Sequence, residues 1–229
     1  MKLRVIVVTL FCFALTMSVF AFDYDFADPR AVEGNNNAKD WKVKSGTWSI
    51  KNGTYDQTDV NGNDGNAFRS IYQSKWVIKD GTVEMKAKHD AKSSGMNDAI
   101  LLYRMEDDDN GYATRLQRDG YLTIGKIMAG AYSHILYTVT SVAADKVYTV
   151  TVKLNGDAID AYLDNKLLVS VKDKTFSEGK IGLCVGRCAF PIHFLSISAE
   201  GDGIPKDNPF AVESLGKLAT TWGNMKKEI

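Results

Sequence analysis

The chain of 229 residues has no excess of charge of either sign, because 28 lysine and arginine residues balance 28 aspartate and glutamate residues. Nucleic-acid binding depends on clustered lysine and arginine, so this balance argues against a nucleic-acid partner. Long apolar runs are also missing beyond the first 21 residues, so we expect no transmembrane segment in the rest of the chain. Helical periodicity is almost absent between residues 22 and 200, which argues against a helical domain.

The first 21 residues have the pattern of a secretory signal peptide. Lys2 and Arg4 form a basic start, an apolar stretch runs to Phe20, and Ala21 supplies a small residue before a cleavage point. We therefore predict a signal peptide at residues 1–21 and an exported protein, either extracellular or periplasmic.

Cysteine is scarce, with three residues in the whole chain. Cys12 leaves with the predicted signal peptide, and Cys184 and Cys188 remain. If residues 185–187 form a hairpin loop, these two cysteines lie opposite each other on neighbouring strands, and export favours a disulfide between them. The alternative is two free thiols that pack as small apolar side chains. Two cysteines are too few for a zinc site, which needs four ligands.

Residues 148–185 carry the clearest pattern of secondary structure. Apolar and polar side chains alternate with a period of two, and Asn155-Gly156 and Asp164-Asn165 interrupt the alternation where turns are expected. Similar turn pairs at Asn52-Gly53, Asp80-Gly81 and Asp119-Gly120 divide the preceding residues into short strands. Many short strands at regular spacing predict an all-β sandwich or barrel.

This part of the chain resembles the concanavalin A-like lectin/glucanase superfamily. The resemblance lies in the run "YTVTVKLNGD", which is followed by an alternating strand, an Asp-Asn turn, a further strand and "FSEGKIGL". "GTWSIKNGTY", "DGTVEMKAK" and "AILLYRMEDDDNGYATRL" extend the resemblance over residues 22–200. Laminin-G-like jelly rolls and bacterial 3-keto-disaccharide hydrolase domains are the most similar branches. The resemblance implies an antiparallel two-sheet jelly-roll sandwich and an oligo- or polysaccharide partner, but one fold supports many activities.

The composition changes after residue 200. Residues 201–209 contain two prolines and two glycines and are predicted to form a linker. In residues 210–229, apolar side chains recur at spacings of three and four, which predicts a short C-terminal amphipathic helix. This tail could dock on its own sandwich or attach the protein to a partner.

No catalytic residue can be assigned. Glucanases of this superfamily carry a Glu-x-Asp-x-x-Glu strand, and the pattern does not occur in this chain. Glu84 and Glu200 are the nearest candidates, and a strand carboxylate beside lysine is usually solvated or ion-paired. His89, His134 and His193 lie far apart in sequence, and each is more typical of a strand end or surface than of a general base.

Polar side chains at one strand parity define a candidate ligand face. The resemblance implies that ligands bind on a concave sheet face, and arginine, tyrosine and carboxylate side chains suit a sugar. If Arg104 pairs near Ala113, then Arg104 and Arg115 project from the same face, and two arginines would also suit an acidic saccharide. Ion pairs on an ordinary solvated sheet are the alternative. The candidate ligand-binding residues are Arg104, Arg115, Gln117, Glu84, Lys86, Asp160 and Tyr162.

Two acidic loops could hold Ca²⁺, which is the one cofactor that the sequence suggests. Residues 106–111 resemble the opening of a calcium-binding loop, with Glu106, Asp108, Asn110 and Gly111 at alternating positions, but Gln117 stands at the twelfth position, where glutamate is required. The candidate metal ligands of this loop are Asp107, Asp108, Asp109 and Asn110. The second loop offers Asp59, Asn61, Asn63 and Asp64. Asp and Asn that cap their own turns are the simpler interpretation.

The sequence therefore favours an exported, non-catalytic carbohydrate-binding module. A glycoside-active domain of the 3-keto-disaccharide hydrolase type and a structural or adhesion module attached through its tail are the alternatives.

Overall fold

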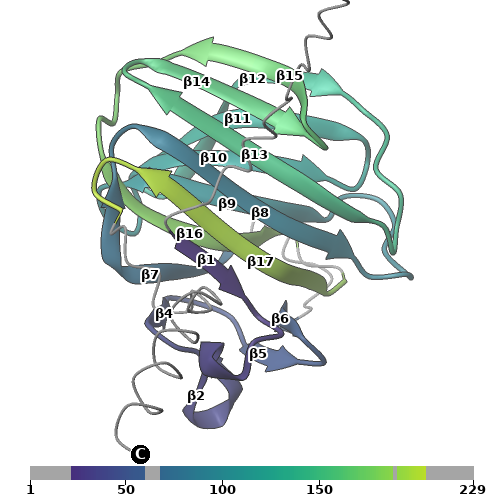
Figure 1. Cartoon of the computed structure of the whole chain (residues 1–229). Helices are drawn as coiled ribbons and strands as arrows, with labels where there is room; N and C mark the ends of the chain where they lie inside the picture. Colours follow the sequence, from purple (N-terminus) through teal and green to yellow (C-terminus); the bar gives the residue numbers. More distant parts are fainter. Residues whose placement is uncertain (1–21, 60–67, 188–189, 205–229) are drawn as a thin grey trace, which may run out of the picture.

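The computed structural model describes residues 22–59, 68–187 and 190–204, and it confirms the all-β prediction. Two antiparallel sheets pack face to face as a jelly-roll sandwich (Figure 1). The predicted signal peptide (1–21) and C-terminal helix (210–229) lie outside the described residues. Within the described ranges, no helix has the length and hydrophobicity that crossing a membrane would need.

The first layer is an eight-stranded sheet. Its order is β15 (Lys166–Lys172), β14 (Ala158–Leu163), β13 (Val147–Asn155), β8 (Gly81–His89), β17 (Ile192–Gly201), β6 (Thr54–Gln57) and β5 (Trp48–Lys51). The eighth strand, β1 (Phe22–Asp25), also pairs with β17.

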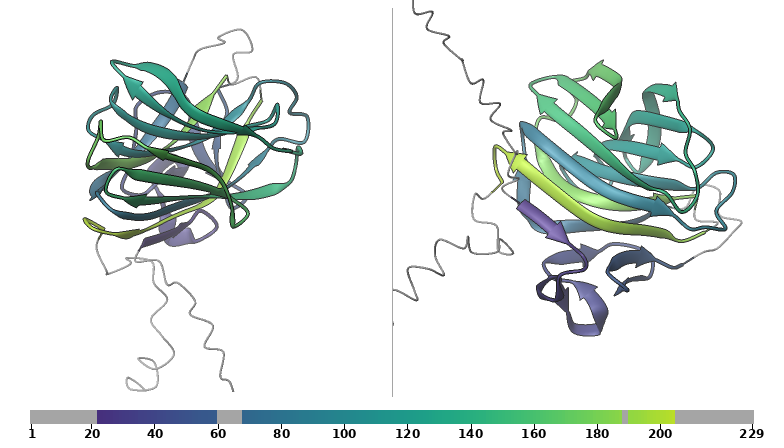
Figure 2. Two further views of the ribbon diagram at one scale, coloured as in Figure 1. Left: turned by 90° about the horizontal axis from the view of Figure 1, so that it is seen from above. Right: turned by 45° about the vertical axis from the view of Figure 1, so that its right-hand side comes forward.

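The second layer is a seven-stranded sheet. Its order is β12 (Ala131–Val139), β11 (Tyr121–Met128), β10 (Gly111–Gln117), β9 (Asp98–Met105), β16 (Gly179–Gly186), β7 (Phe68–Ile78) and β4 (Trp41–Val43). A small ribbon of β2 (Val32–Glu33) and β3 (Asn37–Ala38) lies beside the sandwich with the short 3₁₀ turns η1 (Pro29–Ala31) and η2 (Gly34–Asn36). The two sheets stack as layers in the further views (Figure 2).

Strand alternation builds the core between the two layers. Val83, Met85 and Ala87 of β8 face inward from the eight-stranded sheet, as the sequence predicted. Leu183 and Val185 of β16 face them from the seven-stranded sheet. Because inward and outward residues alternate, each sheet keeps an outer face of its own, and these two outer faces point away from each other.

The folded region extends past the predicted boundary at residue 200. Asp202 exchanges backbone hydrogen bonds with the turn between β7 and β8, through Lys79 and Asp80. Ile204 buries its side chain in the core. Residues 201–204 therefore belong to the sandwich, and the rest of the predicted linker lies outside the described residues.

Candidate functional site

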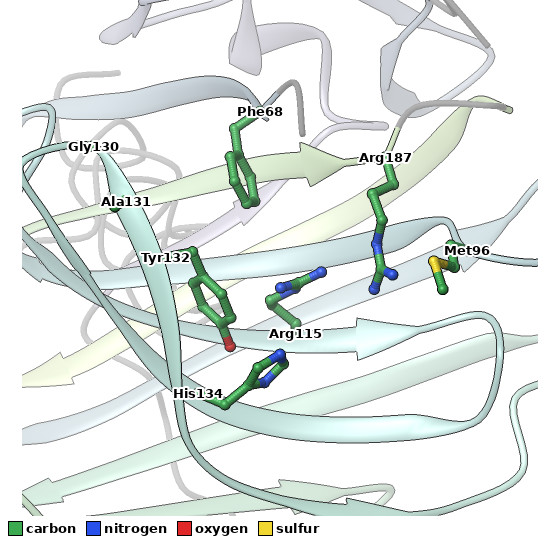
Figure 3. Close-up of a pocket in the computed structure, with 8 residues that line it drawn as sticks. All are labelled: Phe68, Met96, Arg115, Gly130, Ala131, Tyr132, His134 and Arg187. Carbon is green, nitrogen blue, oxygen red and sulfur yellow. The ribbon is translucent and has the colours of Figure 1, made fainter. Parts of the chain in front are cut away.

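A groove opens on the outer face of the seven-stranded sheet, with a volume of about 590 Å³. Figure 3 shows its lining side chains converging from several strands. Gly130, in the turn between β11 and β12, and Ala131, the first residue of β12, form part of its lining. The side chains used below are Phe68, Met96, Arg115, Tyr132, His134 and Arg187.

Strand β10 positions Arg115 through the parity of its residues. Tyr112 and Leu116 face the core, so Ala113, Arg115 and Gln117 face outward. Arg115 therefore emerges on the outer face of the seven-stranded sheet.

A buried carboxylate holds the two arginines of the groove. Asp98, at the start of β9, has 0% of its surface exposed and pairs with Arg115 Nη2. Arg187 donates to both Asp98 oxygens, from Nε at 3.0 Å and from Nη2 at 3.1 Å. A bidentate arginine–carboxylate contact fixes the direction of the guanidinium as well as its position. We call Arg115, Asp98 and Arg187 the arginine clamp.

Aromatic rings cover the Arg115 side of the clamp. The Arg115 guanidinium lies 4.4 Å from the ring centroid of Tyr132 and 5.8 Å from that of Phe68. The Tyr132 hydroxyl is 3.0 Å from Thr123 Oγ1, which fixes the far end of its ring. The ring can lie close to the sheet because its neighbour is Gly125, where a Cβ atom would come within 2.4 Å of Tyr132. Glycine here provides the space in which the aromatic platform lies.

His134 lies beside Tyr132 at a ring-centroid distance of 5.0 Å. Burial lowers the pKa of His134, and the positive charges of Arg115 and Arg187 lower it further. The imidazole is therefore neutral at neutral pH and offers one donor and one acceptor. His134 also borders a smaller hollow of about 180 Å³ with Gln117, Thr123, Tyr121 and Tyr137.

Arg104 does not belong to this groove. The predicted pairing with Ala113 was wrong, because Ala113 pairs with Leu102. Arg104 sits in a bulge with a φ of +47°, and the register against β16 shifts there. This left-handed backbone turns the side chain into the interior, where it is 1% exposed.

The buried Arg104 guanidinium joins turns from both layers. It donates to the carbonyl oxygens of Lys79 at 2.8 Å and Gly156 at 2.9 Å, and to Asp80 Oδ1 at 3.1 Å. A longer contact of 3.4 Å reaches the Phe176 carbonyl. These partners make Arg104 a structural residue and not a ligand contact.

The remaining predicted ligand residues lie on the opposite outer face. Glu84 and Lys86 of β8 and Asp160 and Tyr162 of β14 belong to the eight-stranded sheet, so the structure separates them from Arg115 and Gln117. The prediction of one ligand face for all seven residues was therefore wrong, because those that face outward lie on two opposite faces. The physical reason is that β8 and β14 belong to a different layer from β10, which strand parity alone cannot reveal.

A second hollow of about 440 Å³ lies on this opposite face. Glu84 accepts a hydrogen bond from Thr151 Oγ1 at 2.9 Å, and Lys153 Nζ lies 4.9 Å from the Tyr162 ring centroid. Outside the lining of this hollow, Asp160 accepts a hydrogen bond from Ser170 at 2.5 Å. These contacts resemble the ordinary cross-strand pairs of a solvated sheet.

The predicted calcium loop uses its acidic groups to hold its own turn. Asp107 accepts hydrogen bonds from the Asp109 backbone at 2.7 Å and from Asn110 Nδ2 at 2.9 Å. Asp109 pairs with Lys44 at 2.8 Å, and Asp108 lies 3.9 Å from the same lysine. Among the described residues, no group of histidine, cysteine and acidic side chains is arranged to hold a metal ion. Calcium binding stays a prediction.

Two further predictions reach beyond the described residues. Asp59 pairs with Arg69 at 3.1 Å, but Asn61, Asn63 and Asp64 lie outside. Cys184 is buried on the outer side of β16, and Cys188 lies outside, so the disulfide stays a prediction.

Sequence reasoning missed most of the groove. Alternation in "AYSHILY" places Tyr132 and His134 at the same parity, which is a signal that was available. Asp98 and Arg187 had no such signal, because only the pairing of β9 with β16 brings Asp98 opposite Gly186, next to Arg187.

Comparisons with known proteins support the fold class. No protein-family model matches the chain. The structure is similar to a carbohydrate-binding module, CBM66 from Bacillus subtilis, with a TM-score of 0.62 and 24% identity over 71% of this chain and 96% of that one. It is also similar to a Bacillus licheniformis β-glucanase, with a TM-score of 0.57 and 14% identity over 79% of this chain and 97% of that one. The protein therefore has the concanavalin A-like jelly-roll fold that the sequence predicted.

One curated relative is recognisable from sequence. The levanase of Bacillus subtilis is 28% identical over 156 residues, which are 66% of this chain and 21% of the levanase. The chain thus matches about a fifth of that enzyme's length. Saccharide-binding modules and glycoside-active enzymes both share this fold, so the fold alone does not separate binding from hydrolysis.

Proposed function

We propose that this protein is an exported, non-catalytic carbohydrate-binding module whose ligand lies in the groove over the arginine clamp. One observation supports this most strongly: a buried aspartate holds two arginines in an open hollow, and aromatic rings lie over one of them, Arg115. Sugars need directed hydrogen bonds together with a flat apolar surface, and this arrangement supplies both. Similarity to a carbohydrate-binding module and to a levanase supports a saccharide as the ligand class.

The geometry of this groove favours binding over hydrolysis within it. Glycoside hydrolysis requires two carboxyl groups on either side of the bond that breaks. The described residues that line the groove include none, and the Asp98 carboxylate beneath it is fully buried between two arginines.

A matched pair of tyrosine variants tests the location of the site. Tyr132 lies in the groove and Tyr162 on the opposite face, and each has a cationic side chain over its ring. We expect Tyr132→Ala to weaken saccharide binding at least tenfold, as the loss of a central aromatic contact does in other interfaces, and Tyr162→Ala to leave it unchanged. A glycan array identifies a ligand, and calorimetry on the purified protein measures each affinity. The reverse pattern would place the site on the other sheet.

The same ligands test the hydrolase alternative. Incubation with the bound saccharide and with 3-keto disaccharides should release no reducing sugar. Release that is lost in Glu84→Gln would replace the proposed function with catalysis on the eight-stranded sheet.

A further inference from the structure

The groove contains many hydrogen-bond donors and few acceptors. Each guanidinium carries five N–H donors and no acceptor. Arg187 gives Asp98 hydrogen bonds from Nε and Nη2 only, and Arg115 from Nη2 only. The Nε of Arg115 also has no hydrogen-bond partner, but it is closed to solvent, so only the other N–H groups of the two guanidiniums can reach a ligand. Both guanidinium groups point into the same hollow in Figure 3, so unused donors face the ligand.

The charge of the groove is also one-sided. Among the described residues that line it, Arg115 and Arg187 are the charged ones, and no carboxylate joins them. Asp98 compensates one of the two positive charges from beneath, where it is closed to solvent. The groove therefore keeps about one positive charge. The hollow on the opposite face differs, because Glu84 and Glu200 line it with the single cation Lys153.

Neutral sugar hydroxyls both donate and accept, and a site for a neutral sugar normally supplies acceptors as well as donors. An unsatisfied donor within a closed contact costs free energy, whereas a carboxylate or a sulfate accepts from several donors at once. We propose that the groove selects saccharides whose bound unit carries a carboxylate or sulfate group, which Arg115 and Arg187 hold together. This inference rests on the proposed function, since it specifies the ligand of the same groove.

His134 couples this selection to pH. Tyr132 and Tyr137 of its own strand contact its ring, at centroid distances of 5.0 Å and 6.1 Å. The charges of Arg115 from β10, Arg187 after β16 and Asp98 from β9 also act on it. Burial and the two arginines lower the pKa of His134, and Asp98 opposes them. A bound anion would offset the arginine charges, so the pKa would rise and binding would take up a proton. Affinity for an anionic ligand should therefore increase as the pH falls through the histidine range, and affinity for a neutral ligand should not.

Matched saccharides provide the test. Each neutral oligosaccharide is compared by calorimetry with its uronate-terminated and its sulfated counterpart on the purified full-length protein, and the two anionic arms separate carboxylate from sulfate. We expect one anionic form to bind about tenfold or more tightly than the neutral form at low salt, from charge-assisted hydrogen bonds. The preference should shrink as salt rises, and the anionic ligand should bind more tightly at about pH 5.5 than at about pH 7.5.

Variants link the preference to the groove. Arg187→Gln should abolish the anionic preference, and Arg187→Lys should restore part of it because the charge returns. Arg30→Gln removes the same charge from an exposed residue outside the groove, paired with Asp28, and should change nothing. Thermal unfolding of each variant confirms that it is folded.

The outcomes separate the two claims. Equal or tighter binding of the neutral forms overturns the anion selection and leaves the carbohydrate-binding function in place. Binding of no saccharide, neutral or anionic, overturns both. An anionic preference that survives Arg187→Gln in the folded protein overturns the assignment to this groove.

Discussion

Removal of the Asp98 carboxylate should destabilise the protein strongly, because it leaves two arginines without their shared partner. Asp98 is fully buried and Arg115 is only 5% exposed, so solvent replaces little of the lost interaction. Breaking a buried ion pair by removing one partner costs about 3–5 kcal/mol. This is a large part of the roughly 5–15 kcal/mol that stabilises a typical protein. We therefore expect Asp98→Ala to lower the unfolding temperature by about 10 °C, since a protein of this size loses roughly 2–4 °C per kcal/mol.

Urea unfolding of Asp98→Ala, compared with Asp145→Ala, measures this effect. Asp145 also pairs with a cation, Lys88 at 2.7 Å, but it is 60% exposed, and an exposed pair contributes little. The double variant Asp98→Ala/Arg187→Ala should recover part of the loss, because one of the unpaired charges is then gone. Similar unfolding midpoints for Asp98→Ala and Asp145→Ala would refute the reasoning that the clamp is a buried, mutually dependent unit. Saccharide affinity should also fall in Asp98→Ala, because Arg115 and Arg187 lose their fixed directions.

Three further predictions concern other residues. Arg104→Met should lower the free energy of unfolding, measured in urea, by about 3–5 kcal/mol, because the buried turns lose their hydrogen-bond donors. Saccharide affinity under native conditions should not change. A selective loss of affinity would return this residue to the ligand site. Gly125→Ala should displace the Tyr132 ring, lowering affinity and costing about 1–3 kcal/mol; unchanged affinity would mean that the ring position is unimportant. Hydrogen bonding to Asp56 raises the pKa of His193, so its contribution to stability is fully present below about pH 6.5 and is lost as the pH rises through its folded pKa. The urea midpoints of wild type and His193→Gln should therefore differ at about pH 5.5 and agree at about pH 9. A difference that is the same at both pH values would contradict the assignment.

Strand positions and inward-facing residues were predictable from sequence because each depends on local patterns. The alternation around Val150 and Val152 and the Asn155-Gly156 turn indicated a half-buried hairpin, and the structure confirms it. Such patterns report which side of a strand faces the core, whichever sheet the strand joins.

The site was only partly predictable because it depends on which strands become neighbours. Parity placed Arg115 outward correctly, but it gave no information that Glu84 faces outward from the other layer. Arg104 illustrates a second limit, because a bulge with one left-handed residue reverses the direction that regular alternation predicts. The partnership of Asp98 with Arg187 joins residues distant in sequence and required the three-dimensional structure.

Tyr132 and His134 both belong to β12, which is the border strand of its sheet and pairs with β11 alone. Most of its residues are exposed or only partly buried, so few of them support the hydrophobic interior. Substitutions along this border can therefore alter what the groove accepts while the rest of the sandwich keeps its packing. We therefore expect substitutions that change ligand preference to occur first along β12 and last in the arginine clamp.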